Sequence, residues 1–210
     1  GVMIHYCNNY VVSNEIIGNQ AEFSVGVDLT SGGWTECKGN EVIGNNVTGF
    51  RWAVGLYTSA TDRPIYNNRI YHNNFINYTQ NVNIFRAVFA NFWDDDYPSG
   101  GNYWSDYNGT DYLYGGPYEN QTGVDGIGDV PYVIDENNVD RYPLMAPISV
   151  FNAGTWNGTS YSVDVVSNST VSAFYFNPEE GAFLRFNVTG ESGTTGFCRV
   201  TIPRDLLWVE

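Results

Sequence analysis

Two stretches of this 210-residue chain are rich in acidic residues, and their composition could serve a catalytic or metal-binding centre. The first, residues 91–111, reads NFWDDDYPSGGNYWSDYNGTD and contains the consecutive acids Asp94, Asp95 and Asp96. Successive side chains of an extended segment point to opposite faces, so the three carboxylates cannot all line one cleft. Aspartate at turns accepts hydrogen bonds from nearby backbone N–H groups. We therefore expect no catalytic residues here and predict that the chain is not an enzyme.

The second acidic stretch offers oxygen ligands for calcium. The sequence VDGIGD at residues 124–129 is similar to calcium loops that carry more acids, and Gly123 stands where such a loop has one of them. Calcium takes about six to eight oxygen ligands, so the missing acid weakens the match. Calcium binding is left open as an alternative, and no cofactor is required. The candidate ligands are Asp125, Asp129, Asp135 and Asp140.

Charge and hydropathy exclude several classes of partner. The formal net charge is −14 at pH 7, and an acidic chain without a basic patch argues against nucleic acid and against anionic membranes. No run of 18 apolar residues is present that would span a membrane. His5 and His72 are too isolated to form a general base or a metal site.

The three cysteines have no C-x-x-C spacing, which makes a zinc site improbable. Cys198 alternates with Val200 and Ile202 in GFCRVTI, so we expect a free thiol on the buried face of a strand. Cys7 and Cys37 are candidates for a disulfide if their loops are neighbours.

N-x-[ST] sequons indicate the compartment. Seven occur, which is more than the Asn, Ser and Thr content alone would produce. If they are used, the chain is an extracellular or cell-surface glycoprotein with N-linked glycans among its partners. The acceptor asparagines are Asn46, Asn77, Asn108, Asn120, Asn157, Asn168 and Asn187.

The elements that must position these residues repeat along the first 86 residues. Apolar pairs two residues apart recur in GVMIHY, GVDLTS, AVGLYT and NVNIFR, and their first members, Val2, Val27, Val54 and Val82, are spaced by 25, 27 and 28 residues. A second element falls between them, as NEIIGN at 14–19, NEVIGN at 40–45 and NRIYHN at 68–73. Two elements that share one period predict an all-β fold built on a right-handed parallel β-helix of about 3–4 coils.

Equivalent residues of successive coils should stack about 4.8 Å apart. We expect Val2, Val27, Val54 and Val82 to form one interior stack. A second interior stack is predicted from Ile16, Val42 and Ile70. Asparagines at the ends of the second element should stack at the bends, where their amides can bond to the next coil. The predicted asparagine stacks are Asn14, Asn40 and Asn68, and Asn19, Asn45 and Asn73.

The period fails after residue 86, and residues 87–149 are rich in acids, Gly, Tyr and Pro. The run NFWDDDYPSGGNYWSDYNGTD, followed by DGIGDVPYVIDENNVDRYPLM, resembles the segment that closes NosD-like parallel β-helix repeats in archaeal surface proteins. The resemblance implies a structural cap, and an open β-helix end needs one because it exposes apolar interior and unpaired strand edges. That family's name has a loose link to periplasmic copper handling, but this sequence lacks the Met-, His- or Cys-rich ligand set that copper delivery would need. The cap residues are Trp93, Asp94, Tyr97, Tyr103, Trp104 and Tyr107.

Residues 150–210 predict a small Ig-like β-sandwich from five short strands separated by turn residues, which is incomplete against the usual count of about seven. The strands are YSVDVV, VSAFYF, AFLRFNV, FCRVTI and LLWVE, and the last has no return partner. This region also resembles the small β-domain that follows the cap in those archaeal surface proteins.

These features favour a structural extracellular protein that assembles with copies of itself, head to tail or by strand complementation, into a filament, sheath or surface layer. The expected assembly edges are Val2 and Ile4 at one end and Leu207 and Trp208 at the other. One alternative is an adhesin that binds surface carbohydrate through aromatic rings on the helix flank. The other is a polysaccharide-degrading β-helix enzyme, which would need paired carboxylates on neighbouring coils.

Overall fold

The computed structural model describes residues 1–32, 35–114, 121–156, 158–177 and 183–206. It is an all-β chain whose described part contains a single 3-10 turn, Arg204–Leu206. The chain divides into two compact units, Gly1–Leu144 and Met145–Glu210. The coils and most of the acidic segment 87–149 lie in the first unit, and the three-part division at residues 86 and 149 stays a prediction.

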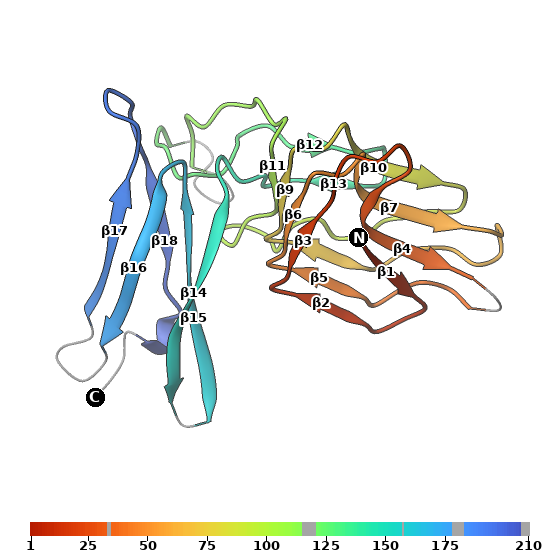
Figure 1. Ribbon diagram of the computed structural model, residues 1–210, viewed down its shortest axis with the longest axis horizontal. Coiled ribbons are helices and arrows are strands. Elements are labelled where there is room, and N and C mark those ends of the chain that lie inside the picture. Colours follow the sequence, from red (N-terminus) through yellow and green to blue (C-terminus); the bar gives the residue numbers. More distant parts are fainter. Residues whose placement is uncertain (33–34, 115–120, 157, 178–182, 207–210) are drawn as a thin grey trace. The chain divides into compact units, whose positions relative to one another are not determined.

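The first unit is a parallel β-solenoid of about four coils, as the repeats predict (Figure 1). Its strands form three parallel sheets with the orders β1-β4-β7-β10, β2-β5-β8 and β3-β6-β9-β11. The strands are β1 Val2–His5, β2 Tyr10–Val12, β3 Glu15–Ile17, β4 Val25–Ser31, β5 Glu41–Ile43, β6 Asn46–Thr48, β7 Trp52–Thr58, β8 Arg69–Tyr71, β9 Asn74–Ile76, β10 Gln80–Phe85 and β11 Tyr103–Trp104.

The first interior stack is confirmed by strand register. Val2 pairs with Val27, Val27 with Val54, and Val54 with Val82 along the sheet β1-β4-β7-β10. Val27 and Val54 are fully buried. Leu29 and Leu56 continue the same alternation two residues later and are also fully buried. One pair of apolar residues from each coil, spaced two residues apart, therefore fills this side of the interior.

The second stack was predicted with the wrong residue in the first coil. Val42 pairs with Val11, not with Ile16, because the segment NYVVSN at 9–14 is the equivalent of NEVIGN. Ile16 instead pairs with Val47 in the neighbouring sheet. The two segments have the same pattern of asparagines around an apolar pair. The connections between strands differ in length, since β1 and β2 are separated by four residues but β4 and β5 by nine.

The fourth coil runs past residue 86. It contains β10, then single parallel bridges at Val88 and Phe92, and then β11. Between Phe92 and β11 the chain leaves the coil in an excursion that carries the acidic run of residues 94–96. The hairpin of β12 (Tyr132–Val133) and β13 (Val139–Asp140) follows, and Leu144 then forms a parallel bridge with Tyr103 of the last coil.

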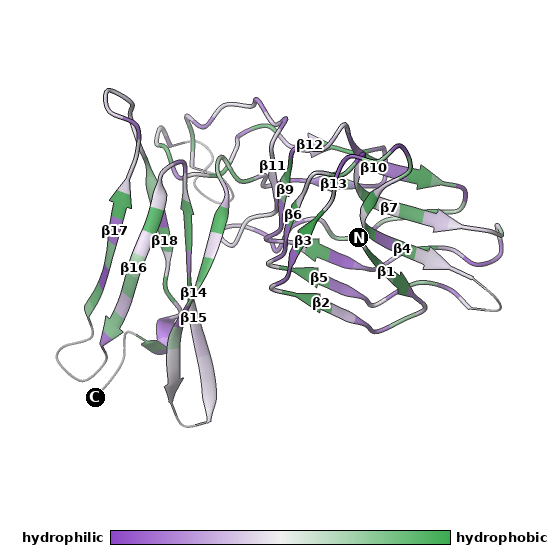
Figure 2. Cartoon of the chain, in the orientation of Figure 1, coloured by the Kyte–Doolittle hydropathy of each residue, from purple (hydrophilic) through white to green (hydrophobic). Residues whose placement is uncertain are grey.

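The second unit contains two antiparallel sheets whose inward side chains form one apolar cluster. Phe151 of one sheet stacks on Phe174 of the other, with ring centroids 4.7 Å apart. Figure 2 shows hydrophobic residues recurring along the strands of both units. The sheets are β14-β15-β18 and β16-β17, formed by β14 Ile148–Trp156, β15 Thr159–Ser167, β16 Thr170–Asn177, β17 Phe183–Thr189 and β18 Cys198–Thr201.

Two expectations for this unit differ from the structure. Its first strand, β14, lies in ISVFNAGTW, which the sequence reading assigned to no strand. The predicted strand LLWVE begins with Leu206, which is the buried last residue of a 3-10 turn, and its other residues lie outside the described part. The Ig-like topology stays a prediction.

Candidate functional site

Two ladders of asparagine side chains run through the coils of the first unit and lead to the acidic segment. In each ladder an asparagine donates its backbone N–H and its Nδ2–H to the Oδ1 of the asparagine in the next coil. Asn45, for example, donates both to Asn73 Oδ1, at 3.0 and 2.9 Å. The first ladder is Asn9, Asn40, Asn68, Asn91 and Asn138, and the second is Asn14, Asn45, Asn73 and Asn102.

The ladders satisfy the backbone at bends that are closed to water. Asn40, Asn45, Asn68 and Asn73 are fully buried, and a buried polar group without a partner is costly. Each side-chain amide also donates to a carbonyl of the preceding coil, as Asn73 Nδ2 does to Val42 O at 2.8 Å. The asparagine stacks predicted at the bends therefore exist. Their first-coil members differ from the prediction: Asn9 stands before Asn40, Asn14 stands before Asn45 instead of Asn40, and Asn19 belongs to neither ladder.

Both ladders end on a carboxylate of the cap. A chain of amides that donate in one direction needs a final group that accepts hydrogen bonds, and a carboxyl group supplies acceptor oxygens. Asn102 donates its backbone N–H to Asp140 Oδ2 at 2.8 Å. Asn138 donates its Nδ2–H to Asp135 Oδ1 at 2.9 Å. Two of the four candidate calcium ligands thus terminate the ladders.

Asp140 is the most deeply placed acid of this site. It is fully buried and also accepts hydrogen bonds from Trp104 Nε1 and from the backbone N–H of Tyr142. Burial raises the pKa of Asp140 to about 7, and the N–H donors of Asn102 and Trp104 act in the opposite direction. The carboxylate fits because residue 101 is glycine: a Cβ at Gly101 would lie 1.9 Å from Asp140 Oδ1.

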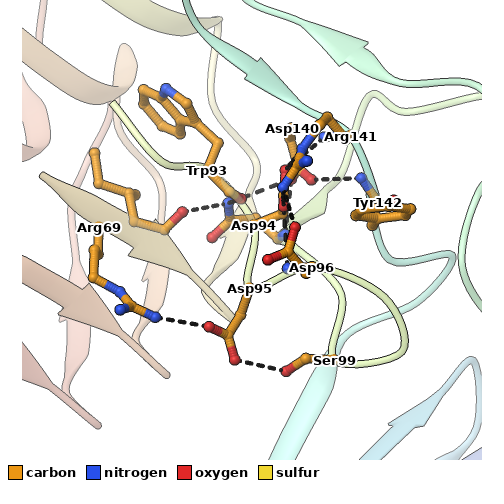
Figure 3. A network of polar contacts seen from close by, with 11 residues as sticks. Arg69, Trp93, Asp94, Asp95, Asp96, Ser99, Asp140, Arg141 and Tyr142 are labelled. Carbon is orange, nitrogen blue, oxygen red and sulfur yellow. Dashed lines mark hydrogen bonds and ion pairs between the residues drawn. The ribbon is translucent and has the colours of Figure 1, made fainter. Parts of the chain in front are cut away.

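The three consecutive aspartates divide between two arginines, with Asp94 and Asp96 at Arg141 and Asp95 at Arg69 (Figure 3). The side chain of Asp94 is 3% exposed and binds the guanidinium of Arg141 through both oxygens, at 3.0 and 2.5 Å. Asp96 is exposed and meets the same guanidinium at 2.5 Å. The Asp94–Arg141 contact joins the excursion of the fourth coil to the end of the cap hairpin.

Asp95 faces the body of the solenoid instead. Its carboxylate accepts from Arg69 Nη2, on β8 of the third coil, at 2.7 Å and from Ser99 Oγ at 3.0 Å. Both ion-pair partners are partly exposed, with side-chain exposures of 47% for Arg69 and 37% for Asp95. This pair is therefore a weaker clamp than the one at Asp94.

Aromatic rings complete the closure of the stack. Trp93 and Trp104 are fully buried, and Trp104 lies between Phe75 of the third coil and Tyr132 of the cap hairpin. The Trp104 and Tyr132 rings are stacked, with centroids 4.5 Å apart and an angle of 7°. Tyr132 thus covers the last coil as the next layer of the interior. Of the remaining predicted cap residues, Tyr97, Tyr103 and Tyr107 are half-buried.

The DGIGD sequence forms a reciprocal backbone latch. Asp111 accepts hydrogen bonds from the backbone N–H groups of Asp125 and Gly126, at 3.1 and 2.8 Å. Asp129 accepts from the backbone N–H groups of Tyr112 and Leu113, at 2.7 and 3.2 Å. The candidate calcium ligands are therefore divided between this latch and the ladder ends. Among the described residues no three His, Cys, Asp or Glu side chains gather as a metal site.

The sequence reading missed Asn102, Asn138, Asp111 and Arg141 as parts of the cap. One signal could have found the first: the tripeptides Asn91-Phe92-Trp93 and Asn102-Tyr103-Trp104 each place a ladder asparagine two residues before a buried tryptophan. No local pattern marks Arg141, because its partner Asp94 is 47 residues away.

The predicted disulfide is not formed, and the three cysteines are free thiols. Cys7 Sγ donates to Glu36 O at 3.2 Å, whereas Cys37 is fully buried and accepts from Asn40 Nδ2. Cys198 is exposed, so its predicted burial was wrong. Its strand β18 lies at the edge of the sheet, and the neighbouring Val200 and Ile202 pack against the core from partly buried positions.

The remaining predicted sites fall on different parts of the surface. Val2 is half-buried and Ile4 is 4% exposed, so this assembly edge offers main chain rather than apolar side chains, and Leu207 and Trp208 lie outside the described residues. The sequon Asn120 and the sequon Asn157 also lie outside the described residues. The other sequon asparagines are exposed, except for the half-buried Asn46. Within the described ranges, no helix is long and apolar enough to cross a membrane.

Comparison with known protein families finds a match for the solenoid. A family model described as "Periplasmic copper-binding protein (NosD)" matches residues 1–109, more than half of the chain, and so covers the coils and the first part of the cap. No curated protein and no solved structure matches the chain.

Proposed function

The chain belongs to the NosD family, and from this premise we propose that it is a structural module of an exported surface protein, which assembles with copies of itself through exposed β edges. The family description names a periplasmic protein, which supports export. The proposal extends to a filament, a sheath or a surface layer as the assembled form.

One observation carries the proposal: the solenoid is directional, with the cap at one end and, among the described residues, unpaired strand edges of the first coil at the other. At the capped end the cap terminates both ladders and covers the rings of the last coil. At the other end β1, β2 and β3 each pair with a strand on one side only. Asn9 and Asn14 have exposed side chains, and no described residue donates to their Oδ1 atoms. An open row of backbone and amide acceptors is a template for pairing with another β edge.

The second unit supplies edges that such a template can meet. β14 and β18 are the outer strands of its three-stranded sheet, and β16 and β17 form a sheet of two strands. A contact between the open coil of one copy and a sheet edge of the next is heterologous. Contacts of this kind propagate in one direction and produce fibres when the rotation does not close. Stacking of two solenoids coil on coil is opposed by the cap.

The edge contact is tested with matched substitutions in the full chain. Tyr10 is 70% exposed on the edge strand β2, and Tyr57 is 45% exposed on the inner strand β7. A lysine on an edge strand opposes edge-to-edge pairing. We expect light scattering and electron microscopy to show assembly that Tyr10→Lys reduces and Tyr57→Lys preserves. A monomer over the whole accessible concentration range would exclude the proposal.

Copper binding is the function that the family description suggests, and the side chains here do not fit it. Copper favours imidazole and sulfur ligands held close together. Met3 and His5 lie two residues apart on β1, and both are exposed, but among the described residues no three His, Cys, Asp or Glu side chains gather as a metal site. His72 Nε2 lies 3.1 Å from Ser99 O, and Cys37 is buried inside the coil. We expect equilibrium dialysis to show no stoichiometric copper.

Carbohydrate binding has less support than assembly. The exposed pair Tyr57 and Phe85 on the solenoid flank is stacked face to face, with centroids 5.0 Å apart. The guanidinium of Arg86 lies 5.0 Å from the Phe85 ring centroid. The ring faces that a sugar would stack on are thus partly occupied. Catalysis is also not part of the proposal, because Asp94 and Asp95 are engaged in ion pairs.

A further inference from the structure

The sequons of the described part differ in how their acceptor nitrogens are held. N-glycosylation modifies the side-chain Nδ2 of asparagine, so that atom must be exposed and free of structural hydrogen bonds. The sequence cannot make this distinction, because all these sites have the same N-x-T pattern. The structure separates them into two groups.

Asn46 is built into the solenoid. It lies in β6, between Glu15 of β3 and Asn74 of β9 in the parallel register. Its Nδ2 donates to both carboxylate oxygens of Glu15, at 3.0 and 2.9 Å, and its Oδ1 is buried. A glycan on this nitrogen would displace Glu15 and crowd strands that lie about 4.8 Å away on both sides.

Asn168 is exposed but holds a loop of the second unit together. Its Nδ2 donates to Thr195 O at 3.2 Å, and its Oδ1 accepts from the backbone N–H of Phe197 at 2.9 Å. Both bonds span almost 30 residues of sequence and join the turn before β16 to the segment before β18. A glycan on Asn168 would therefore disturb this connection.

In Asn77 the amide oxygen, and not the amide nitrogen, is the atom held by the protein. It is exposed at the bend after β9, with a φ of 53°. Gln20 Nε2 donates to Asn77 Oδ1 at 2.9 Å and to Asn77 O at 3.2 Å. The acceptor side of the amide is thus fixed against the first coil. No described residue accepts from Nδ2, which is left to solvent.

Asn108 and Asn187 are also exposed, and their side chains form no hydrogen bond with the described residues. Asn108 lies in the irregular segment after β11. Asn187 lies on β17 and pairs with Ser172 in a sheet of only two strands. A glycan at either position would extend into solvent without breaking a contact of the fold.

We propose that Asn77, Asn108 and Asn187 accept N-linked glycans in the folded protein and that Asn46 and Asn168 do not. The inference rests on the proposed export of the chain. The donor is a lipid-linked oligosaccharide pyrophosphate: the bond from its sugar C1 to the pyrophosphate oxygen breaks, and C1 bonds to Nδ2. The amide loses one proton, and the lipid pyrophosphate leaves.

The test compares the folded full-length chain with short peptides that contain each sequon. Both are incubated with a single-subunit oligosaccharyltransferase and a lipid-linked oligosaccharide, and occupancy is measured by peptide mapping and mass spectrometry. The peptides report the preference for local sequence, so the ratio of protein to peptide reports access in the fold. Asn77→Gln and Asn46→Gln proteins serve as matched controls on intact mass.

We expect Asn77, Asn108 and Asn187 to be modified at similar rates in protein and peptide. Asn46 should be slower in the protein by about tenfold or more, because its modification requires local opening of β6. Asn168 should also be slowed. The intact mass should lose one glycan in Asn77→Gln and none in Asn46→Gln. Equal modification of Asn46 and Asn77 in the folded chain would overturn the inference, whereas loss of self-assembly would leave this result unchanged.

Discussion

A buried asparagine of a ladder should contribute more to the free energy of unfolding than an exposed one, and the second ladder contains both kinds. Asn73 is fully buried, whereas Asn14, at the open end of the same ladder, is exposed. Replacing Asn73 with alanine leaves the backbone N–H of Asn45 without its acceptor, Asn73 Oδ1. It also removes the Nδ2 bonds to Val42 O, Tyr71 O and Asn102 Oδ1.

The magnitude follows from these contacts. A stranded buried donor costs about 1–3 kcal/mol, and each of the three lost hydrogen bonds contributes about 0.5–1.5 kcal/mol. Summed, these terms predict that Asn73→Ala lowers the free energy of unfolding by about 2.5–7.5 kcal/mol. Asn14→Ala should cost less than about 1 kcal/mol, because water replaces its bonds at the surface.

Urea unfolding of both variants measures the difference. The buried Trp93 and Trp104 report the first unit by fluorescence, and far-ultraviolet circular dichroism reports the strands. Similar slopes against urea would show that the denatured states are comparable. The reasoning is refuted if the two variants lose the same free energy, or if Asn73→Ala loses less than about 1 kcal/mol.

Three further predictions concern the cap and the thiols. Arg141→Ala leaves the buried Asp94 carboxylate unpaired and should cost about 1–3 kcal/mol, whereas Asp95→Ala should cost less than about 1 kcal/mol; urea midpoints that rank the variants in the opposite order would contradict this. The folded-state pKa of Asp140, about 7, lies above its ordinary 3.8, so between these pH values the folded chain binds a proton at Asp140 that the unfolded chain does not. Protonation therefore stabilises the folded chain at low pH, and this contribution to the free energy of unfolding is lost as pH rises from about 4 to about 7. The difference between these two pKa values corresponds to about 4 kcal/mol. The free energy of unfolding is measured for the wild type and for Asp140→Asn from about pH 4 to about pH 7, and a difference between the two proteins that does not change with pH would disprove the prediction. Cys198 should react with maleimide in the folded protein, while Cys37, whose pKa burial raises to about 12, should react only on unfolding. Mass spectrometry of the labelled peptides measures the order of reaction, and labelling of Cys37 before Cys198 would contradict this prediction.

The acidic segment shows why local composition gives an incomplete description of a site. Asp94, Asp95 and Asp96 were expected to serve turns, and the backbone N–H of Asp96 does bond to Asp94 Oδ1. Their main partners, however, are the distant Arg69 and Arg141. Asp125 and Asp129 resemble calcium ligands in sequence. The Asp129 carboxylate instead holds the backbone of Tyr112 and Leu113, and the backbone N–H of Asp125 is held by the distant Asp111. Sequence spacing records neither relationship.

The sequence by itself determined the solenoid, because its information is local and repeated. An apolar pair once per coil, as at Val27 and Val54, places one interior stack, and asparagines that flank the second element place the bends. Only the tertiary structure decided that NYVVSN, rather than NEIIGN, begins the ladders. Both segments satisfy the same pattern, and pairing with the next coil selects between them. It also decided that Asp140 terminates a ladder 38 residues from Asn102, because a stack of donors ends wherever the fold brings a buried acceptor.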